Sequence, residues 1–163
     1  MIIRPTTADE LARVLQIYAD ARAFMRENGN PDQWGESYPP EALIRADVAE
    51  GRSYVCVEDG EILGVFYYAE GDDPTYGYSE DGAWLDGAPY GVIHRIAVAA
   101  RGRGVAAACF DFALSQCGNV RIDTHTRNLP MQHTLEKNGF VRCGTIYVED
   151  GSPRIAYQKR DDG

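Results

Sequence analysis

Cysteine is scarce in this sequence of 163 residues, and the few cysteines form no pattern. The four are Cys56, Cys109, Cys117 and Cys143, and no two of them make a C-x-x-C motif. This spacing is unsuited to a zinc site, and the chain is larger than those that depend on a disulfide framework. We therefore expect no metal and four free thiols, mostly buried as small apolar side chains.

Long hydrophobic runs are also missing. No apolar stretch approaches the roughly 20 residues that a membrane-spanning helix requires. The first residues enter an amphipathic helical pattern directly, without the continuous apolar centre of a signal peptide. Hydrophobic residues make up 44% of the chain and charged residues 25%, as in ordinary globular proteins. We predict a single domain over residues 1–163, in the cytoplasm and without membrane contact.

Positive charge is in short supply, because 16 Lys and Arg stand against 25 Asp and Glu and give a net charge of −9. A field of this sign repels phosphate backbones, so we expect no nucleic-acid partner. The acidic balance either serves solubility alone or also attracts a cationic substrate such as an amine. The sequence also lacks G-x-x-x-x-G-K-[ST], the string that a P-loop requires.

The spacing of apolar residues predicts a mixed sheet flanked by helices. A capping box at Thr7 and Glu10 starts the first helix, and Gly51 ends the second. Residues 28–40 and 70–90 are rich in turn formers and are expected to be loops, the second unusually long for a compact domain. The expected helices cover residues 8 to the mid-twenties, 41–49, 104–116 and 130–139, and the expected strands 54–57, 61–69, 91–98, 120–124, 140–148 and 154–158.

The stretch from residue 91 to residue 113 is the most informative about chemistry. A strand runs into the loop Arg101, Gly102, Arg103 and Gly104, which opens directly into a helix. Such a helix start offers free N–H groups and a positive dipole end to an anion, and glycines let the anion approach closely. The loop therefore predicts a pyrophosphate cradle, the other interpretation being a turn with two solvated arginines. The dinucleotide motif G-x-G-x-x-G fits less well, because its third glycine is absent and the loop lies far from the first βα turn.

These residues resemble the GNAT acetyltransferase family. Its loop motif [QR]-x-x-G-x-[GA] is matched by Arg101, Gly104 and Ala106. A second family motif follows at the expected spacing, and the start of the chain fits the family's first strand. The matching residues are Asn128, Glu136, Lys137, Gly139 and Phe140 for the motif, and Ile3, Arg4 and Pro5 for the strand.

The resemblance implies an α/β (α+β) fold with a mixed, mostly antiparallel sheet of six to seven strands. About four helices flank that sheet, which is splayed at its fourth and fifth strands. It also implies acetyl-CoA as cosubstrate: the backbone at the bulge of the fourth strand pairs with the pantetheine arm, and an exposed amide polarises the thioester carbonyl. Asn128 binds the pantetheine, caps the last helix, or does both. By resemblance, the residues that hold acetyl-CoA are Ile96, Ala97, Val98, Arg101, Gly102, Arg103, Gly104, Val105, Ala106, Asn128 and Met131.

Acetyl transfer to an amine needs a proton acceptor, because an alkyl amine with a pKa near 10 is protonated at neutral pH. His94 is one candidate base, and strand alternation puts it on the face of Ile96 and Val98. His125, with Asp123 near it at the end of the next strand, is another, and a water relay through acids of the loops is a third. Either histidine also has the plainer interpretation of a hydrogen-bonded structural residue.

One position departs from the family pattern. Many relatives carry a tyrosine before the Glu-Lys pair as proton donor to the departing thiolate, whereas this sequence has Leu135 there. Either another group donates that proton, or the thiolate leaves with electrostatic help alone.

Four aromatic residues, Trp34, Tyr38, Trp84 and Tyr90, lie in the two loops that flank the acceptor side in this family. They wall an acceptor pocket, or they pack within the loops. We predict an N-acetyltransferase acting on a small amine, an amino acid or a peptide N-terminus. The alternative is an acyl-CoA-binding sensor or interaction module without turnover. Dimers are common among relatives, so the resemblance leaves a homodimer as an open alternative to a monomer.

Overall fold

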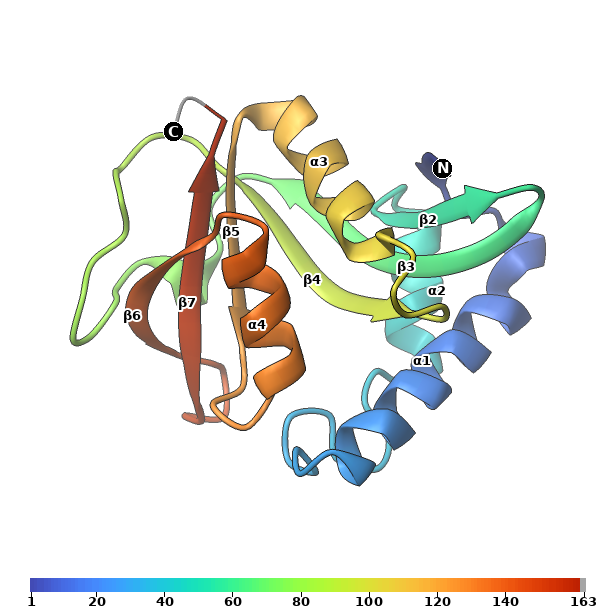
Figure 1. Cartoon of the computed structure of the whole chain (residues 1–163), viewed down its shortest axis with the longest axis horizontal. Coiled ribbons are helices and arrows are strands. Elements are labelled where there is room, and N and C mark those ends of the chain that lie inside the picture. Colours follow the sequence, from blue (N-terminus) through green and yellow to red (C-terminus); the bar gives the residue numbers. More distant parts are fainter. Residues whose placement is uncertain (162–163) are drawn as a thin grey trace. The chain divides into compact units, whose positions relative to one another are not determined.

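The computed structural model describes residues 1–161, and a seven-stranded sheet is its central feature (Figure 1). The strands are β1 (Ile2–Pro5), β2 (Ser53–Glu58), β3 (Glu61–Glu70), β4 (Gly91–Val98), β5 (Asn119–Thr124), β6 (Val141–Tyr147) and β7 (Pro153–Arg160). The helices are α1 (Leu11–Glu27), α2 (Glu41–Ala49), α3 (Val105–Cys117) and α4 (Leu129–Lys137), with short 3-10 turns η1 (Ala8–Glu10) and η2 (Pro74–Tyr76). The strand order is β1-β2-β3-β4-β5-β7-β6, in which β4 and β5 pair in parallel and β1–β2, β2–β3, β5–β7 and β6–β7 are antiparallel. The predicted fold class is confirmed.

The individual elements follow the hydrophobic pattern closely. Helix α2 and strand β4 have the predicted bounds, and the other predicted elements agree to within a few residues. Strand β1 is too short for its alternation to predict it, and only the resemblance indicated it. All four cysteines are free and three are buried, as predicted. Within residues 1–161, no helix is both long and apolar enough to cross a membrane.

The chain packs as two compact units, each built from two separated segments. The first unit joins Met1–Tyr68 to His94–Phe112, and the second joins Ala69–Ile93 to the chain from Ala113 onward. The core of the first unit combines side chains of α1, α2, β2, β3 and β4. Its fully buried members include Val14, Ile44, Val55 and Val65. The core of the second unit combines side chains of the loop after β3 with those of β4, β6 and β7. Its members include Tyr76, Val92, Cys143, Ile146 and Ala156.

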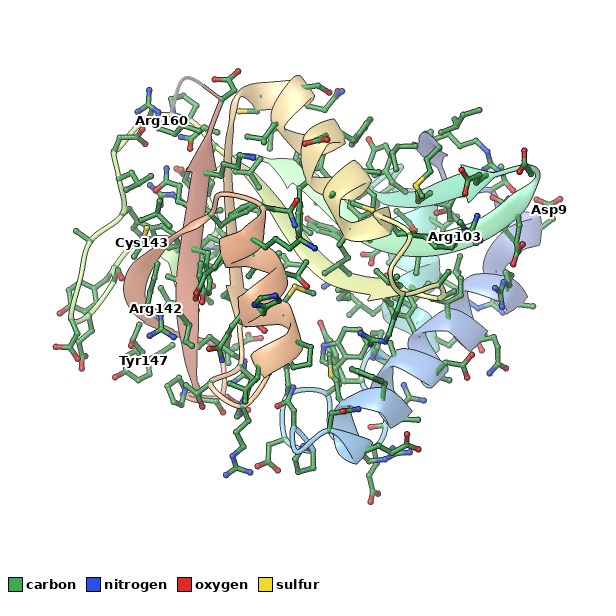
Figure 2. The ribbon with its side chains drawn as sticks, viewed as in Figure 1. Asp9, Arg103, Arg142, Cys143, Tyr147 and Arg160 are labelled. Atoms are coloured by element: carbon green, nitrogen blue, oxygen red, sulfur yellow. The ribbon has the colours of Figure 1, made fainter. Side chains whose placement is uncertain are left out.

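In the second unit, the long loop covers the exposed edge of β6 (Figure 1). Glu80 and Thr145 exchange two backbone hydrogen bonds of 2.8 Å, which form an isolated bridge. Ser79 Oγ donates to the carbonyl of Cys143 at 2.6 Å, and Tyr147 Oη donates to Glu80 Oε1 at 3.2 Å. Figure 2 labels Cys143 and Tyr147 on this strand. The loop therefore satisfies backbone groups that an edge strand otherwise leaves open.

Two glycines allow the loop to lie directly on β6. A Cβ at Gly82 would meet the carbonyl oxygen of Cys143 at 2.6 Å, and a Cβ at Gly144 would meet that of Glu80 at 2.5 Å. Gly144 also has φ of +114°, a conformation that other residues rarely adopt. Backbone therefore packs on backbone at this contact, with no room for a Cβ at either glycine.

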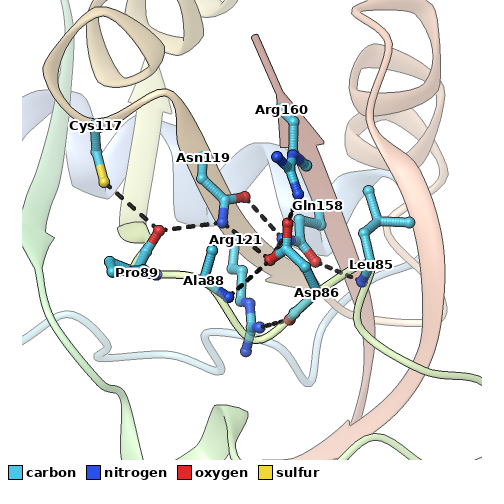
Figure 3. A network of polar contacts seen from close by, with 9 residues as sticks. All are labelled: Leu85, Asp86, Ala88, Pro89, Cys117, Asn119, Arg121, Gln158 and Arg160. Carbon is cyan, nitrogen blue, oxygen red and sulfur yellow. Dashed lines mark hydrogen bonds and ion pairs between the residues drawn. The ribbon is translucent and has the colours of Figure 1, made fainter. Parts of the chain in front are cut away.

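Asp86 fastens the other end of the loop to β5 and β7 (Figure 3). Its carboxylate accepts hydrogen bonds from Asn119 Nδ2 and Gln158 Nε2, both at 3.2 Å, and pairs with Arg160. Its carbonyl accepts a hydrogen bond of 2.8 Å from Arg121 Nη2. Because Gln158 is fully buried, this network ties the loop to the interior of the unit. The loop is thus anchored to the sheet at both ends.

We predict that Gly144→Ala lowers the free energy of unfolding by about 2–4 kcal/mol, because it adds both a left-handed alanine and a backbone clash. Gly87→Ala, in the same loop, is the matched control: a Cβ there meets nothing within 4 Å. We expect the control to change stability by no more than about 1 kcal/mol. Urea unfolding of the three proteins measures both differences, and equal stabilities would contradict the close packing of loop and strand.

The N-terminal strand is held to the first helical turn by charge. Arg4 forms a two-pronged ion pair with Glu10, at 2.9 Å and 2.7 Å, and the same carboxylate accepts from the amide of Thr7 at 2.9 Å. The predicted capping box is therefore present, with Arg4 added to it. The hydrogen bond from Arg4 is the main reason that the pKa of Glu10 falls from 4.5 to about 2.

A lowered carboxyl pKa stabilises the folded state above pH 4.5, and that stabilisation is lost as the pH falls from 4.5 towards 2. We predict that Glu10→Gln costs about 1–2 kcal/mol at pH 7, a range that allows for the partial exposure of Arg4. The cost should shrink by pH 3. Glu50→Gln, which removes an exposed pair with Arg52, is the control and should change little at either pH. A cost for Glu10→Gln that does not depend on pH would rule out the ionic contribution.

Candidate active site

The loop between β4 and α3 presents an open, glycine-lined helix start. Residues 101–104 are all exposed, and α3 begins at Val105. Gly102 and Gly104 each have φ of +74°, and a Cβ built on either would meet nothing within 4 Å. The backbone therefore curls with open space above both glycines, at the end of a 13-residue helix whose first amides have no partner within the helix. This geometry suits an anion such as a pyrophosphate.

The start of α3 lies tightly against the sheet. A Cβ at Gly64, on β3, would meet Val105 Cγ1 at 2.7 Å and the carbonyl oxygen of Ala97 at 3.3 Å. Glycine at this position lets the first residue of α3 approach the point where β3 and β4 lie side by side. The loop between β4 and α3 is therefore held at both ends by packed residues.

Both arginines of the loop contact other residues of the first unit. The Arg101 guanidinium lies over the ring of Phe24, with Cζ 3.3 Å from the ring centroid, and burial lowers its pKa. Arg103, labelled in Figure 2, forms an ion pair with Glu58. The two positive charges are thus anchored on α1 and β2.

Strand β4 runs from Gly91 to Val98 but has an irregular backbone at Arg95, here called the break in β4. Arg95 has φ of +49°, in the left-handed region. His94 and Arg95 both contact the ring of Tyr67, with a centroid distance of 5.6 Å for the imidazole and 4.5 Å from Arg95 Cζ. Adjacent side chains of a regular strand point to opposite faces. The regular alternation is therefore disturbed at Arg95, and the placement of His94 on the face of Ile96 and Val98 stays a prediction.

In the second unit, Asp123 near the end of β5 is paired with a tyrosine of the long loop. Tyr76 Oη donates to Asp123 Oδ2 at 2.5 Å. Tyr76 is fully buried, and this burial, with the charge of Asp123, raises the pKa of its hydroxyl well above the usual value. Tyr76 therefore stays protonated and holds the carboxylate of Asp123 in one orientation.

His125 lies just beyond β5 and is half-buried. Its Nδ1 accepts a hydrogen bond of 3.0 Å from the amide of Arg127, and its carbonyl accepts one of 3.1 Å from Gln132 Nε2. A neutral imidazole that accepts at Nδ1 carries its proton on Nε2.

Asn128 caps the last helix, as one of its two predicted roles requires. Its Oδ1 accepts from the amide of Met131 at 3.2 Å, Pro130 occupies the first turn, and only 7% of Asn128 is exposed. The structure thus places the predicted residues of the cofactor site on two separate elements, the β4–α3 segment in the first unit and the start of α4 in the second.

Comparison with known proteins identifies the family. The family model described as "Acetyltransferase (GNAT) family" matches residues 13–140, which is most of the chain. This chain belongs to the GNAT acetyltransferase family. It is similar to a GNAT-family acetyltransferase from Streptococcus agalactiae 2603, with 32% identity and a TM-score of 0.89 over 98% of this chain and 94% of that one.

Two further crystal structures share the GNAT fold at lower identity. One is a putative acetyltransferase from Staphylococcus aureus Mu50, at 21% identity and a TM-score of 0.69 over 98% of this chain and 99% of that one. The other is a ribosomal-protein-alanine N-acetyltransferase from Brucella melitensis, at 21% identity and a TM-score of 0.64 with the same coverage. No curated protein sequence gives a significant match.

The aromatic residues predicted for the acceptor side of this GNAT protein lie mostly in packed positions. Trp34 is 7% exposed and packs on Tyr18 and Tyr38, whereas Tyr38 is more open. In the second unit, the Arg121 guanidinium lies between the rings of Trp84 and Tyr90, 4.2 Å and 4.0 Å from their centroids.

Several polar residues around these elements escaped the sequence analysis. Asp47 is 4% exposed on α2 and pairs with Arg95, and Tyr76 supports Asp123. Asp47 could have been noticed, because it falls on the apolar stripe of its helix beside Ile44, where an unpaired charge is costly. No sequence signal marks Arg95, since the left-handed conformation is uncommon for arginine.

Proposed function

We propose that this GNAT protein is an N-acetyltransferase that moves the acetyl group of acetyl-CoA to a primary amine by direct attack. The observation that carries the proposal is the open helix start at Gly102 and Gly104, in the loop whose sequence matches the family's cofactor motif. The two left-handed glycines suit a pyrophosphate, because a Cβ built on either would meet no atom of residues 1–161 within 4 Å. Acceptors in this class include small amines, amino acids and peptide N-termini.

The residues assigned to acetyl-CoA divide by role. Backbone amides of Gly102, Gly104, Val105 and Ala106 would bind the pyrophosphate, with Arg101 and Arg103 adding charge beside it. The backbone at Ile96, Ala97 and Val98 would hold the pantetheine arm. Acetyl-CoA supplies an activated acetyl group as a thioester. An exposed amide of β4 would donate to its carbonyl oxygen, a contact of the kind worth roughly 3–4 kcal/mol in a transition state.

His94 is the better of the two histidine bases. At His125, Nδ1 already accepts from the Arg127 amide, so taking up a proton there would break that bond. His94 lies on β4, directly before the break at Arg95, and its ring is half-buried against Tyr67. We therefore assign to the His94 ring the removal of a proton from the substrate ammonium, which gives the neutral amine that attacks the thioester.

No proton donor to the thiolate can be taken from the family pattern. Leu135 is fully buried and has no transferable proton, and Tyr76 is fully buried with a strongly raised pKa. We propose that the thiolate leaves with electrostatic help alone, which its thiol-like pKa near 8.5 permits.

The net charge of −9 supports a cationic acceptor and no nucleic-acid partner. A cytoplasmic location and a homodimer remain predictions from sequence. A binding module without turnover is the alternative function. This alternative would be excluded if replacement of the catalytic base abolished turnover and left the affinity for CoA unchanged.

We predict that Gly104→Glu abolishes acetyl-CoA binding, because it adds bulk and negative charge where the pyrophosphate should lie. Gly151→Glu is the matched control, since Gly151 has a similar φ of +85° and open surroundings in the β6–β7 turn. Both variants carry the same backbone strain, so calorimetric titration separates strain from loss of the site. Unchanged affinity in folded Gly104→Glu would overturn the cradle.

We predict that His94→Ala lowers kcat by roughly 10²–10⁴-fold, as loss of a general base does. The loss should be greatest at low pH, where removal of the amine proton limits the rate. His133→Ala, on the exposed face of α4, is the control and should keep wild-type kcat. Thiol release from acetyl-CoA against a panel of amines measures both, and a pH–rate profile parallel to wild type would place the base elsewhere.

A further inference from the structure

A buried ion pair lies at the break in β4. Arg95 Nε and Nη2 donate to Asp47 Oδ2 and Oδ1, each at 3.0 Å, in a two-pronged geometry. The Asp47 side chain is 5% exposed and that of Arg95 11%. Arg95 Nη1 donates to Tyr38 Oη at 3.3 Å, and its Cζ lies 4.5 Å above the ring of Tyr67. Residues of α2, β3 and the loop after α1 therefore all contact the arginine.

Both features of this site cost free energy. A left-handed conformation is unfavourable for any residue with a Cβ, and burial of two charges removes their hydration. Burial raises the pKa of the Asp47 carboxyl, with Arg95 acting in the opposite direction. Strained backbone persists where its surroundings over-determine it, and such positions cluster at active sites. Arg95 directly follows His94 and directly precedes Ile96.

We propose that Asp47 and Arg95 are positioning residues, whose ion pair holds the break in β4 and so fixes the direction of the amides that follow it. This inference rests on the proposed function, because those amides are the ones assigned to the acetyl carbonyl and the pantetheine arm. The side chain of Arg95 pulls toward α2, which turns the peptide after it. Without the pair, the left-handed backbone at residue 95 loses its support, and the amides that follow it are no longer fixed in one direction.

Direct contact between Arg95 and the substrate is a poorer explanation. All three guanidinium nitrogens donate to Asp47 or Tyr38, and one face of the group is covered by Tyr67. A substrate carboxylate would have to displace these partners and leave Asp47 buried without its counter-charge. The pair acts on the reaction through the backbone.

The test uses the difference between glycine and alanine at position 95, both in an Asp47→Asn background so that no unpaired charge stays buried. Glycine adopts the left-handed conformation without strain, whereas alanine does not. We expect Asp47→Asn/Arg95→Ala to lower kcat about 10–100-fold with acetyl-CoA affinity changed much less, as misplaced catalytic groups do. Asp47→Asn/Arg95→Gly should recover a large part of kcat. Equal losses in the two variants, or wild-type kcat in the alanine variant, would overturn the proposal.

Glu41→Gln is the matched control on α2, because it removes an exposed ion pair with Arg45 and should leave kcat unchanged. Thermal unfolding without ligand gives a second readout that does not depend on turnover. The glycine variant should unfold at a higher temperature than the alanine variant, and equal midpoints would overturn the strained break. If the wild-type protein showed no turnover with any amine but the two unfolding midpoints still differed, the proposed function would be refuted. The strained conformation at position 95 would still be supported.

Discussion

The buried ion pair between Asp47 and Arg95 is the interaction on which, in our proposal, the geometry of the candidate active site depends. Strand β4 carries the candidate base His94 and then leads to the loop before α3. The ion pair contacts β4 between His94 and that loop. A regular strand would present His94 and Arg95 on opposite faces. The left-handed residue instead brings both against Tyr67 and redirects the backbone that follows.

The loop beyond the break depends on glycine in a different way. Gly102 and Gly104 provide the left-handed turns that expose the helix start, and Gly64 lets α3 close onto the sheet. In the second unit, Gly82 and Gly144 likewise allow a close contact, because they let the long loop pack directly on the edge of β6. Anchored by Asp86, this loop is part of the folded framework, although its composition is that of a mobile segment.

Sequence patterns predicted every helix and strand except β1, most of their bounds, and a mixed sheet flanked by helices. These features follow from local signals such as apolar spacing, helix caps and turn residues, which act over a few residues. The failures of sequence reasoning lie where distant segments meet. Asp47 with Arg95 and Tyr76 with Asp123 are each separated by nearly 50 positions. The left-handed conformation at Arg95 likewise has no local signal, and the ion pair that accompanies it joins distant segments.

The most direct test of the account is thermal and chemical unfolding with and without acetyl-CoA, alongside ATP and NAD. A ligand that binds only the folded state at 100-fold excess over its Kd raises the free energy of unfolding by about 2.7 kcal/mol. The account predicts stabilisation of this size by acetyl-CoA and little or none by the two nucleotides. No stabilisation by acetyl-CoA, or a larger one by ATP or NAD, would contradict the assignment of the glycine loop and the acetyltransferase function built on it.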